Sequence, residues 1–210
     1  MVRVICLFIG YVFGLFQTAY IYGRMNGIDI REYGSGNAGT TNALRVLGKK
    51  AGIIVLLGDV AKTVLAVLLV RILFQRDYGD MLPLLGIYAA AGAILGHNYP
   101  VHLGFKGGKG IACTAGLVLT LGPIVTVLES ATFLLAVFLT RYVSLGSILV
   151  VIELVMDLVV LGQMGYYGMS QEHLLEFYLV CTALSGMAIW RHKMNIKNLL
   201  HGTERKIFQK

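Results

Sequence analysis

The sequence has little charge. Only 14% of its 210 residues are Asp, Glu, Lys or Arg, while 57% are hydrophobic, and the mean hydropathy is +0.74. A soluble domain has about 45–50% apolar residues and about a quarter charged ones. One domain of this length could not bury so much apolar sequence. These values exclude a soluble globular protein and predict an integral membrane protein.

The sequence is also poor in cysteine and in linker-like segments. Its three cysteines, Cys6, Cys113 and Cys181, lie in apolar stretches without the spacing of a metal site, so we expect small core residues. No repeat, low-complexity linker or second domain is evident, which predicts one domain over residues 1–210. The net charge of +7 fits attraction to anionic lipid. No soluble basic domain is present that would bind nucleic acid.

Long apolar stretches predict an all-α, polytopic bundle. A span needs about 20 mostly apolar residues. The first stretch could be a cleaved signal, but it lacks a small-residue cleavage site and is taken as a span. Residues 111–140 are apolar but interrupted at Gly122-Pro123, which predicts two short spans or a re-entrant pair. Seven membrane helices result, of which the five full spans are 2–23, 51–73, 82–97, 145–163 and 174–191.

The distribution of Lys and Arg predicts the orientation. The connections 24–50 and 98–110 and the C-terminal tail carry most of these residues and alternate so that they share one side. Because cytoplasmic loops are enriched in Lys and Arg, the N-terminus is expected outside and the C-terminus in the cytoplasm.

The first basic connection contains the segment GSGNAGTTNALR at 34–45. Glycine permits positive φ angles that turn backbone N–H groups toward an anion. A helix capped here by Asn or Thr would add its N-terminus, and an Arg one turn later can hold a phosphate. An ordinary flexible loop is the alternative. The run of donors favours a phosphate site formed by Gly34, Ser35, Gly36, Asn37, Thr41, Asn42 and Arg45.

The second basic connection reads GHNYPVHLGFKGGKG at 96–110. It is not a nucleotide P-loop, since no strand precedes it and Lys109 is followed by glycine. Anchoring by cytoplasmic charge would explain its lysines but not its glycines. The segment therefore predicts a second phosphate site, with Lys106, Gly107, Gly108, Lys109 and Gly110. His97 could be a general base or could cap its helix; both readings stay open.

The tail from Trp190 alternates apolar and basic residues, which predicts a short interfacial helix. His192 and Asn195 are three residues apart, so they share a helical face and could point together into a site. Glu204 is the only acid in this tail, and we expect it to pair with a nearby Arg or Lys.

Charges inside apolar spans are usually paired or functional. Asp59 and Lys62 are three residues apart and are predicted to pair and stabilise the bundle. Glu153 and Asp157 share one helix face and could pair with basic groups, carry raised pKa values or line a polar cavity; the sequence leaves this open. In the connection RYVSLGS at 141–147, Ser144 or Ser147 could cap the next helix or add a donor to the site.

Together the three polar segments resemble the motifs of the bacterial acyl-phosphate:glycerol-3-phosphate acyltransferases, the PlsY family. GSGNAGTTNALR, GHNYPVHLGFKGGKG and RHKMNIKNLLHGTE carry the resemblance, which covers nearly the whole chain. The pair Thr40-Thr41 is a slight departure from an expected Ala-Thr.

The resemblance implies transfer of a fatty acyl group from acyl phosphate to the 1-hydroxyl of glycerol 3-phosphate. The products are lysophosphatidic acid and phosphate, in the first step of bacterial phospholipid synthesis. It further implies a bacterial cytoplasmic membrane, an active site facing the cytoplasm, and no metal or other cofactor. The expected partners are the two substrates and membrane lipid; the oligomeric state is not predicted.

The resemblance also suggests residue roles. Transfer is assigned to Ser35, Arg45, His192 and Asn195, and Glu204 is expected to hold the tail. The resemblance also gives Lys109 a role at phosphate and lets Gly107, Gly108 and Gly110 shape the phosphate loop. The chemistry of the loops adds further candidates for phosphate binding: Gly34, Gly36, Asn37, Thr41, Asn42, His97, Lys106 and Ser144.

Acyl phosphate is a mixed anhydride, so direct attack without an acyl-enzyme is expected, with the proton going to a substrate phosphate oxygen or to His192. A Ser35 acyl-enzyme is the competing mechanism. The His-x-x-x-x-Asp box of other acyltransferases is absent at His97 and His102. A transporter of a phosphorylated molecule is a weaker alternative, because the anion-binding loops cluster on one face and no inverted repeat is evident.

Overall fold

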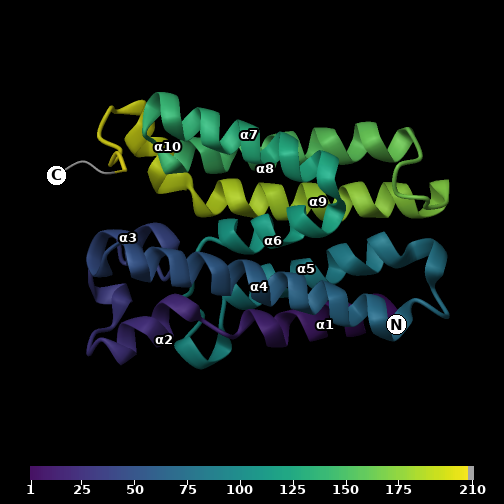
Figure 1. Ribbon diagram of the computed structural model, residues 1–210, viewed down its shortest axis with the longest axis horizontal. Helices are drawn as coiled ribbons and strands as arrows, with labels where there is room; N and C mark the ends of the chain where they lie inside the picture. The colour runs from purple at the N-terminus through teal and green to yellow at the C-terminus, as the bar shows by residue number, and fades with distance from the viewer. Residues whose placement is uncertain (208–210) are drawn as a thin grey trace. The chain divides into compact units, whose positions relative to one another are not determined.

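The computed structural model describes residues 1–207, and within them all regular structure is helical (Figure 1). The chain divides into two compact units, Met1–Thr120 and Leu121–Lys210, which are described separately. The expectation of one domain over the whole chain stays a prediction.

The first unit contains two basic connections between long apolar helices. The elements are α1 (Val2–Gly14), α2 (Thr18–Met25), η1 (Ile30–Glu32), α3 (Thr40–Leu47), α4 (Lys49–Phe74), η2 (Gly79–Met81), α5 (Leu82–Asn98), η3 (Val101–Leu103) and α6 (Ile111–Leu121). A short helix, α2 or α3, lies between each of the longer helices α1 and α4 and the first polar loop.

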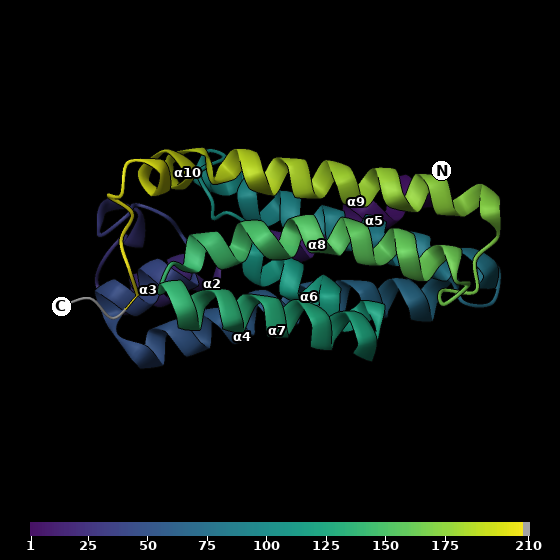
Figure 2. The same ribbon diagram turned by 90° about the horizontal axis from the view of Figure 1, so that it is seen from above.

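The second unit is built on three long helices that lie side by side in both views (Figures 1 and 2). A short helix follows the third. The elements are α7 (Pro123–Thr140), α8 (Val143–Gln163), α9 (Gln171–Arg191) and α10 (Lys193–Leu200). The last of these is the short helix that the tail pattern predicts.

Six helical segments of the described residues are long and apolar enough to cross a membrane. They contain all five predicted full spans, so the prediction of an all-α polytopic membrane protein is confirmed. In the interrupted stretch, α7 is an 18-residue candidate span and only α6 is short. The structure thus has one full-length and one short helix there, where the sequence suggested a short pair.

The sequence suggested a continuous first span, but in the structure this span is broken between α1 and α2. The side chain of Gln17 lies in the break and is 1% exposed. Its Nε2 donates to the carbonyl oxygens of Gly14, Gly96 and His97 at 3.0, 3.1 and 3.2 Å. Backbone groups freed at a helix break must be satisfied internally in an apolar setting. Gln17 does this while tying the break to the end of α5.

Small residues let α1 and α5 pack backbone to backbone. Gly10 and Gly14 lie one turn apart on α1, and Gly92 and Gly96 repeat this spacing on α5. A Cβ at Gly10 would collide with the carbonyl oxygen of Ala89, and one at Gly96 with that of Tyr11. Such small-residue pairs allow close helix approach in membranes. This contact holds the C-terminal end of α5, where His97 lies, against the helix break.

The second unit contains an acidic cluster in its long helices. Glu129 of α7 is 4% exposed and lies near Glu153 and Asp157 of α8. Both carboxylate oxygens of Glu129 are buried without a hydrogen-bond partner among the described residues. Glu153 Oε2 and Asp157 Oδ2 are also buried without a hydrogen-bond partner among the described residues. Pairing with basic groups and lining a polar cavity both stay hypotheses for these acids.

Candidate functional site

The first polar loop is folded around the side chain of Asn42, which is 1% exposed. Its Oδ1 accepts the backbone N–H of Ser35 at 2.8 Å, and its Nδ2 donates to the carbonyl oxygens of Ile30 and Tyr33 at 3.1 and 3.0 Å. Gly34 and Gly36 have φ of +63° and +71°, the conformations for which glycine is suited. Asn42 therefore shapes the loop, and Ser35 is exposed.

The helix that follows this loop begins as predicted but is not capped by Asn or Thr. The N-cap of α3 is Gly39, which makes no side-chain cap bond. Arg45 lies in the last turn of α3 and is exposed. Asn37 is half-buried beside the cap, and Thr41 lies in the first turn.

The first and second polar loops contact one another within the first unit. Asp29 anchors Arg31 by a hydrogen-bonded ion pair of 2.7 Å, and Arg31 Nη1 donates to the carbonyl oxygen of Leu103 at 3.2 Å. The hydrogen bond from Arg31 lowers the pKa of Asp29 to about 2. The carboxylate is therefore charged through the neutral range, and the link between the loops persists there.

The second polar loop folds back onto the end of α5. The backbone N–H of Gly107 donates to the carbonyl oxygen of Asn98 at 3.2 Å, and that of Gly108 to His97 at 3.1 Å. A Cβ at Gly107 would collide with the carbonyl oxygen of His97, and one at Gly108 with His97 Nε2. The structure thus gives a packing reason for both glycines. That they also admit a phosphate stays a prediction.

The lysines of this loop differ in burial: Lys106 is exposed and Lys109 is half-buried. Gly110 has a φ of +86° and starts the turn into α6. A Cβ at Gly108 would also come within 2.8 Å of the carbonyl oxygen of Ala38 in the first loop. Two glycine-rich segments, about 70 residues apart in sequence, are thus neighbours, with cationic side chains on both.

The predicted pair of Asp59 and Lys62 is present, with Nζ 2.8 Å from Oδ1. His97 is 3% exposed and its Nδ1 lies 2.8 Å from the same Nζ. The C-cap residue of α5 is Tyr99. Lys62 and His97 lie 35 residues apart in sequence, on α4 and α5, so sequence spacing gives no signal of their contact.

In the second unit Glu204 organises the tail. Its Oε1 accepts from Ser144 Oγ and Asn195 Nδ2, each at 2.7 Å, and its Oε2 accepts from Asn198 Nδ2 at 3.3 Å. A hydroxyl and two amides thus donate to this carboxylate, and the expected pairing with an Arg or Lys stays a prediction. Ser144 does not cap α8, whose N-cap is Tyr142, and Ser147 bonds to the Val143 carbonyl in its own helix.

His192 lies at the junction of α9 and α10 and is 3% exposed. Its Nδ1 lies 2.7 Å from the carbonyl oxygen of Ala188. A carbonyl oxygen only accepts, so Nδ1 carries a proton; in the neutral imidazole the basic lone pair is then on Nε2. The sequence placed His192 and Asn195 on one face, and the structure shows that each is fixed by its own contact.

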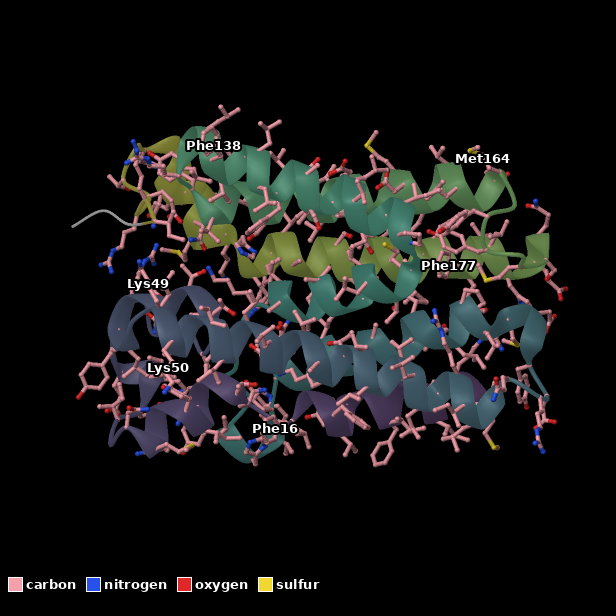
Figure 3. All side chains as sticks on the ribbon, in the orientation of Figure 1. Phe16, Lys49, Lys50, Phe138, Met164 and Phe177 are labelled. Carbon is pink, nitrogen blue, oxygen red and sulfur yellow. The ribbon has the colours of Figure 1, made fainter. Side chains whose placement is uncertain are left out.

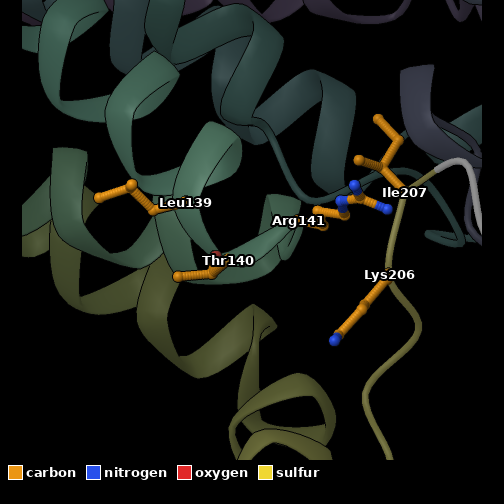
Figure 4. A pocket seen from close by; sticks show the side chains of 5 residues that line it. All are labelled: Leu139, Thr140, Arg141, Lys206 and Ile207. Atoms are coloured by element: carbon orange, nitrogen blue, oxygen red, sulfur yellow. The ribbon is translucent and has the colours of Figure 1, made fainter.

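A pocket of about 240 Å³ lies at the turn between α7 and α8, where the tail returns (Figure 4). It is lined by Leu139, Thr140, Arg141, Lys206 and Ile207. The Ile207 N–H donates to the Arg141 carbonyl oxygen at 2.8 Å. None of the predicted site residues lines this pocket, which is formed by docking of the tail.

The contacts of Glu204 predict the effect of a neutral replacement. In Glu204→Gln the amide nitrogen would face one of the donors that now bonds to a carboxylate oxygen, leaving two donors opposed. We expect activity about tenfold lower, with the fold retained. Glu172→Gln, at an exposed position in the first turn of α9, is the control. Initial rates and thermal unfolding of both variants are the measurement, and unchanged activity in Glu204→Gln would contradict the role given to these contacts.

The fold and the loops define an α-helical, polytopic membrane protein that carries glycine-rich, cationic segments suited to phosphate. Residues 4–202 match the family model described as glycerol-3-phosphate acyltransferase. Two relatives of that name are 41% identical (Clostridioides difficile strain 630, 99% of this chain and 96% of the relative) and 39% identical (Alkaliphilus metalliredigens strain QYMF, 100% and 98%).

Solved structures agree with the sequence comparisons. The glycerol 3-phosphate form of PlsY (YgiH), an integral membrane glycerol 3-phosphate acyltransferase, is 30% identical, with a TM-score of 0.84 and 99% of each chain covered. Its lysophosphatidic acid form gives a TM-score of 0.81 at 30% identity, with 97% of this chain and 94% of that one covered.

The chain belongs to the glycerol-3-phosphate acyltransferase family, of the PlsY type. It is an integral membrane acyltransferase of phospholipid synthesis that forms lysophosphatidic acid.

Proposed function

We propose that the acyl donor is an acyl phosphate and that the glycerol hydroxyl attacks it directly. The observation that carries this proposal is the contact between the two glycine-rich loops, each of which bears cationic side chains. Both substrates would bring a phosphate group, and a pair of joined, cationic loops can hold anionic headgroups at the membrane boundary.

The chemistry requires little from a protein nucleophile. In an acyl phosphate the bond that breaks joins the acyl carbon to a phosphate oxygen, so the leaving group is already good. The bond that forms joins the acyl carbon to the glycerol 1-oxygen, and phosphate leaves with the electron pair. The enzyme then acts by orientation and by stabilising the developing charge.

Each predicted residue receives a role in this scheme. Arg45 and Lys109 neutralise phosphate oxygens, with Lys106, Asn37 and Thr41 as further donors, and the Ser35 hydroxyl orients the headgroup. His192 Nε2 accepts the proton of the attacking hydroxyl, because Nδ1 is engaged by the Ala188 carbonyl. Asn195 and Ser144 are held in place through Glu204. Gly34, Gly36, Asn42, Gly107, Gly108 and Gly110 shape the loops.

We further propose a bacterial cytoplasmic membrane with the polar loops in the cytoplasm and the N-terminus outside. The distribution of Lys and Arg supports this orientation. The three native cysteines are buried, so single cysteines introduced at Lys50 and Asp77 would report accessibility with low background. Labelling of position 50 from the cytoplasmic side and of position 77 from the outside is expected; the reverse pattern would contradict the orientation.

The donor is tested with the purified protein in lipid nanodiscs. Long-chain acyl phosphate and glycerol 3-phosphate should give lysophosphatidic acid and free phosphate in equal amounts. The acyl-CoA of the same chain should give no product. Equal rates with acyl-CoA would show that the donor assignment is wrong while leaving the family assignment intact.

A further inference from the structure

Lys62 is the centre of a buried hydrogen-bond network in the first unit. Its Nζ lies 2.8 Å from Asp59 Oδ1, 2.8 Å from His97 Nδ1 and 2.9 Å from the carbonyl oxygen of Phe16. The side chains of Lys62, Asp59 and His97 are 4%, 1% and 3% exposed. An ammonium has three N–H donors and no acceptor. Each donor therefore has one partner, on α4, on α5 and at the break after α1.

This arrangement fixes the tautomer of His97. Because the ammonium can only donate, Nδ1 of His97 must accept, and the ring proton is on Nε2. The alternative, an imidazolium paired with Asp59, fits the geometry less well. Asp59 Oδ1 is 3.7 Å from His97 Nδ1 but 2.8 Å from Lys62 Nζ, and Thr18 Oγ1 donates to the same oxygen at 3.1 Å.

The ammonium also occupies the place that a metal ion would take. The ligand atoms of Asp59, His97 and Cys113 lie within 4.8 Å of one another, and all three residues are buried. Lys62 Nζ already bonds two of these groups. The network therefore has its own positive charge, and an ion there would have to displace the side chain that makes three hydrogen bonds.

The Nε2 side of the ring faces the second glycine-rich loop. A Cβ at Gly108 would collide with His97 Nε2, and the Gly108 N–H donates to the His97 carbonyl oxygen at 3.1 Å. Lys62 contacts the other ring nitrogen, Nδ1, and thereby determines whether Nε2 presents an N–H or a lone pair to this loop.

We propose that Lys62 is a positioning residue for acyl transfer, which holds His97 as a neutral Nε2–H donor toward the loop 107–110 and so excludes it as the general base. The inference rests on the proposed role of that loop in binding phosphate. His97 would then present an N–H to the loop where negative charge is held.

The wild-type protein gives the first test. In protein labelled with ¹⁵N at histidine, the His97 signal is assigned by its loss in His97→Gln. We expect Nδ1 to resonate as an unprotonated, pyridine-type nitrogen and Nε2 as a protonated one. An Nδ1–H tautomer or an imidazolium in the folded wild type would overturn the proposal. This spectrum does not depend on which acyl donor is used. Failure of the tautomer proposal can therefore be distinguished from failure of the donor assignment.

The second test removes the ammonium. In Lys62→Met, with chelator present, Asp59 becomes the neighbour of Nδ1, so we expect Nδ1 to become protonated and kcat to fall about 100-fold, the loss typical of one donor at developing charge. Lys50→Met, at an exposed position on the same helix (Figure 3), should change neither the His97 tautomer nor kcat. Retention of the wild-type tautomer, or of activity within about twofold, would contradict the role of Lys62.

Removing one partner of a buried ion pair can prevent folding, because it leaves the other charge unpaired. The double variant Asp59→Leu/Lys62→Met removes both charges and keeps apolar volume. We expect it to fold, to show a mixture of both His97 tautomers, and to lose activity like the single variant. A folded double variant with a pure Nε2–H tautomer or with near-normal kcat would also overturn the proposal. If neither variant folds, the wild-type spectrum decides.

Discussion

Gly108→Ala is expected to lower kcat/KM by at least about 100-fold. The added Cβ would collide with His97 Nε2 and would come within 2.8 Å of the carbonyl oxygen of Ala38. Neither neighbour can move easily, since one is a buried ring held by Lys62 and the other is backbone. The substitution should therefore push the second glycine-rich loop away from the first. Displacing groups that orient the substrate by about 1 Å is enough for a loss of this size.

The control is Gly79→Ala, in the same unit. A Cβ at Gly79 would meet nothing within 4 Å, and its backbone is not left-handed. This variant should keep full activity. Steady-state rates of both variants, with gel-filtration profiles to verify folding, are the measurement. Activity of Gly108→Ala within threefold of the control would show that close packing of the loops is not needed for catalysis.

His192→Asn is expected to lower kcat by about 10²- to 10⁴-fold with little change in the amount of folded protein. An asparagine amide can still donate to the Ala188 carbonyl, so the junction of α9 and α10 keeps its hydrogen bond. The variant lacks the basic nitrogen at the position of Nε2. A loss in kcat with KM nearly unchanged is the expected result, since a general base acts mainly in the transition state.

His201 offers a matched control, because its Nδ1 also lies 2.7 Å from a carbonyl oxygen four residues earlier, that of Lys197, but the residue is exposed. His201→Asn should retain activity. If His192→Asn also retained wild-type kcat, the proton would have to go to a substrate phosphate oxygen. The base role of His192 would then be excluded.

Much of the helical architecture is predictable, because a membrane span needs a continuous apolar stretch and leaves a strong local signal. The helices α4, α8 and α9 begin and end within three residues of the predicted spans 51–73, 145–163 and 174–191. The break between α1 and α2 is not predictable in this way. It depends on hydrogen bonds from Gln17 to Gly96 and His97, which lie 79 and 80 residues away in a sequence that is otherwise mostly apolar around Gln17.

The site shows the same division between local and distant contacts. The pair of Asp59 and Lys62 follows from their spacing on one helix, whereas the contact of Lys62 with His97 requires the packing of α4 on α5. The sequence treated Asn42 as a ligand donor, but the folded loop uses all its side-chain groups. Glu129 is a further acid within an apolar helix, and such a position is itself a signal in the sequence.

The most direct test of the mechanism is a single-turnover experiment with acyl phosphate labelled in its acyl chain. Wild-type protein is mixed with the labelled donor, first without and then with glycerol 3-phosphate, and quenched in acid. Direct attack predicts label in lysophosphatidic acid and none on the protein at any time. Label that appears on the protein before product, and that is lost in Ser35→Ala, would establish an acyl-enzyme and contradict the account.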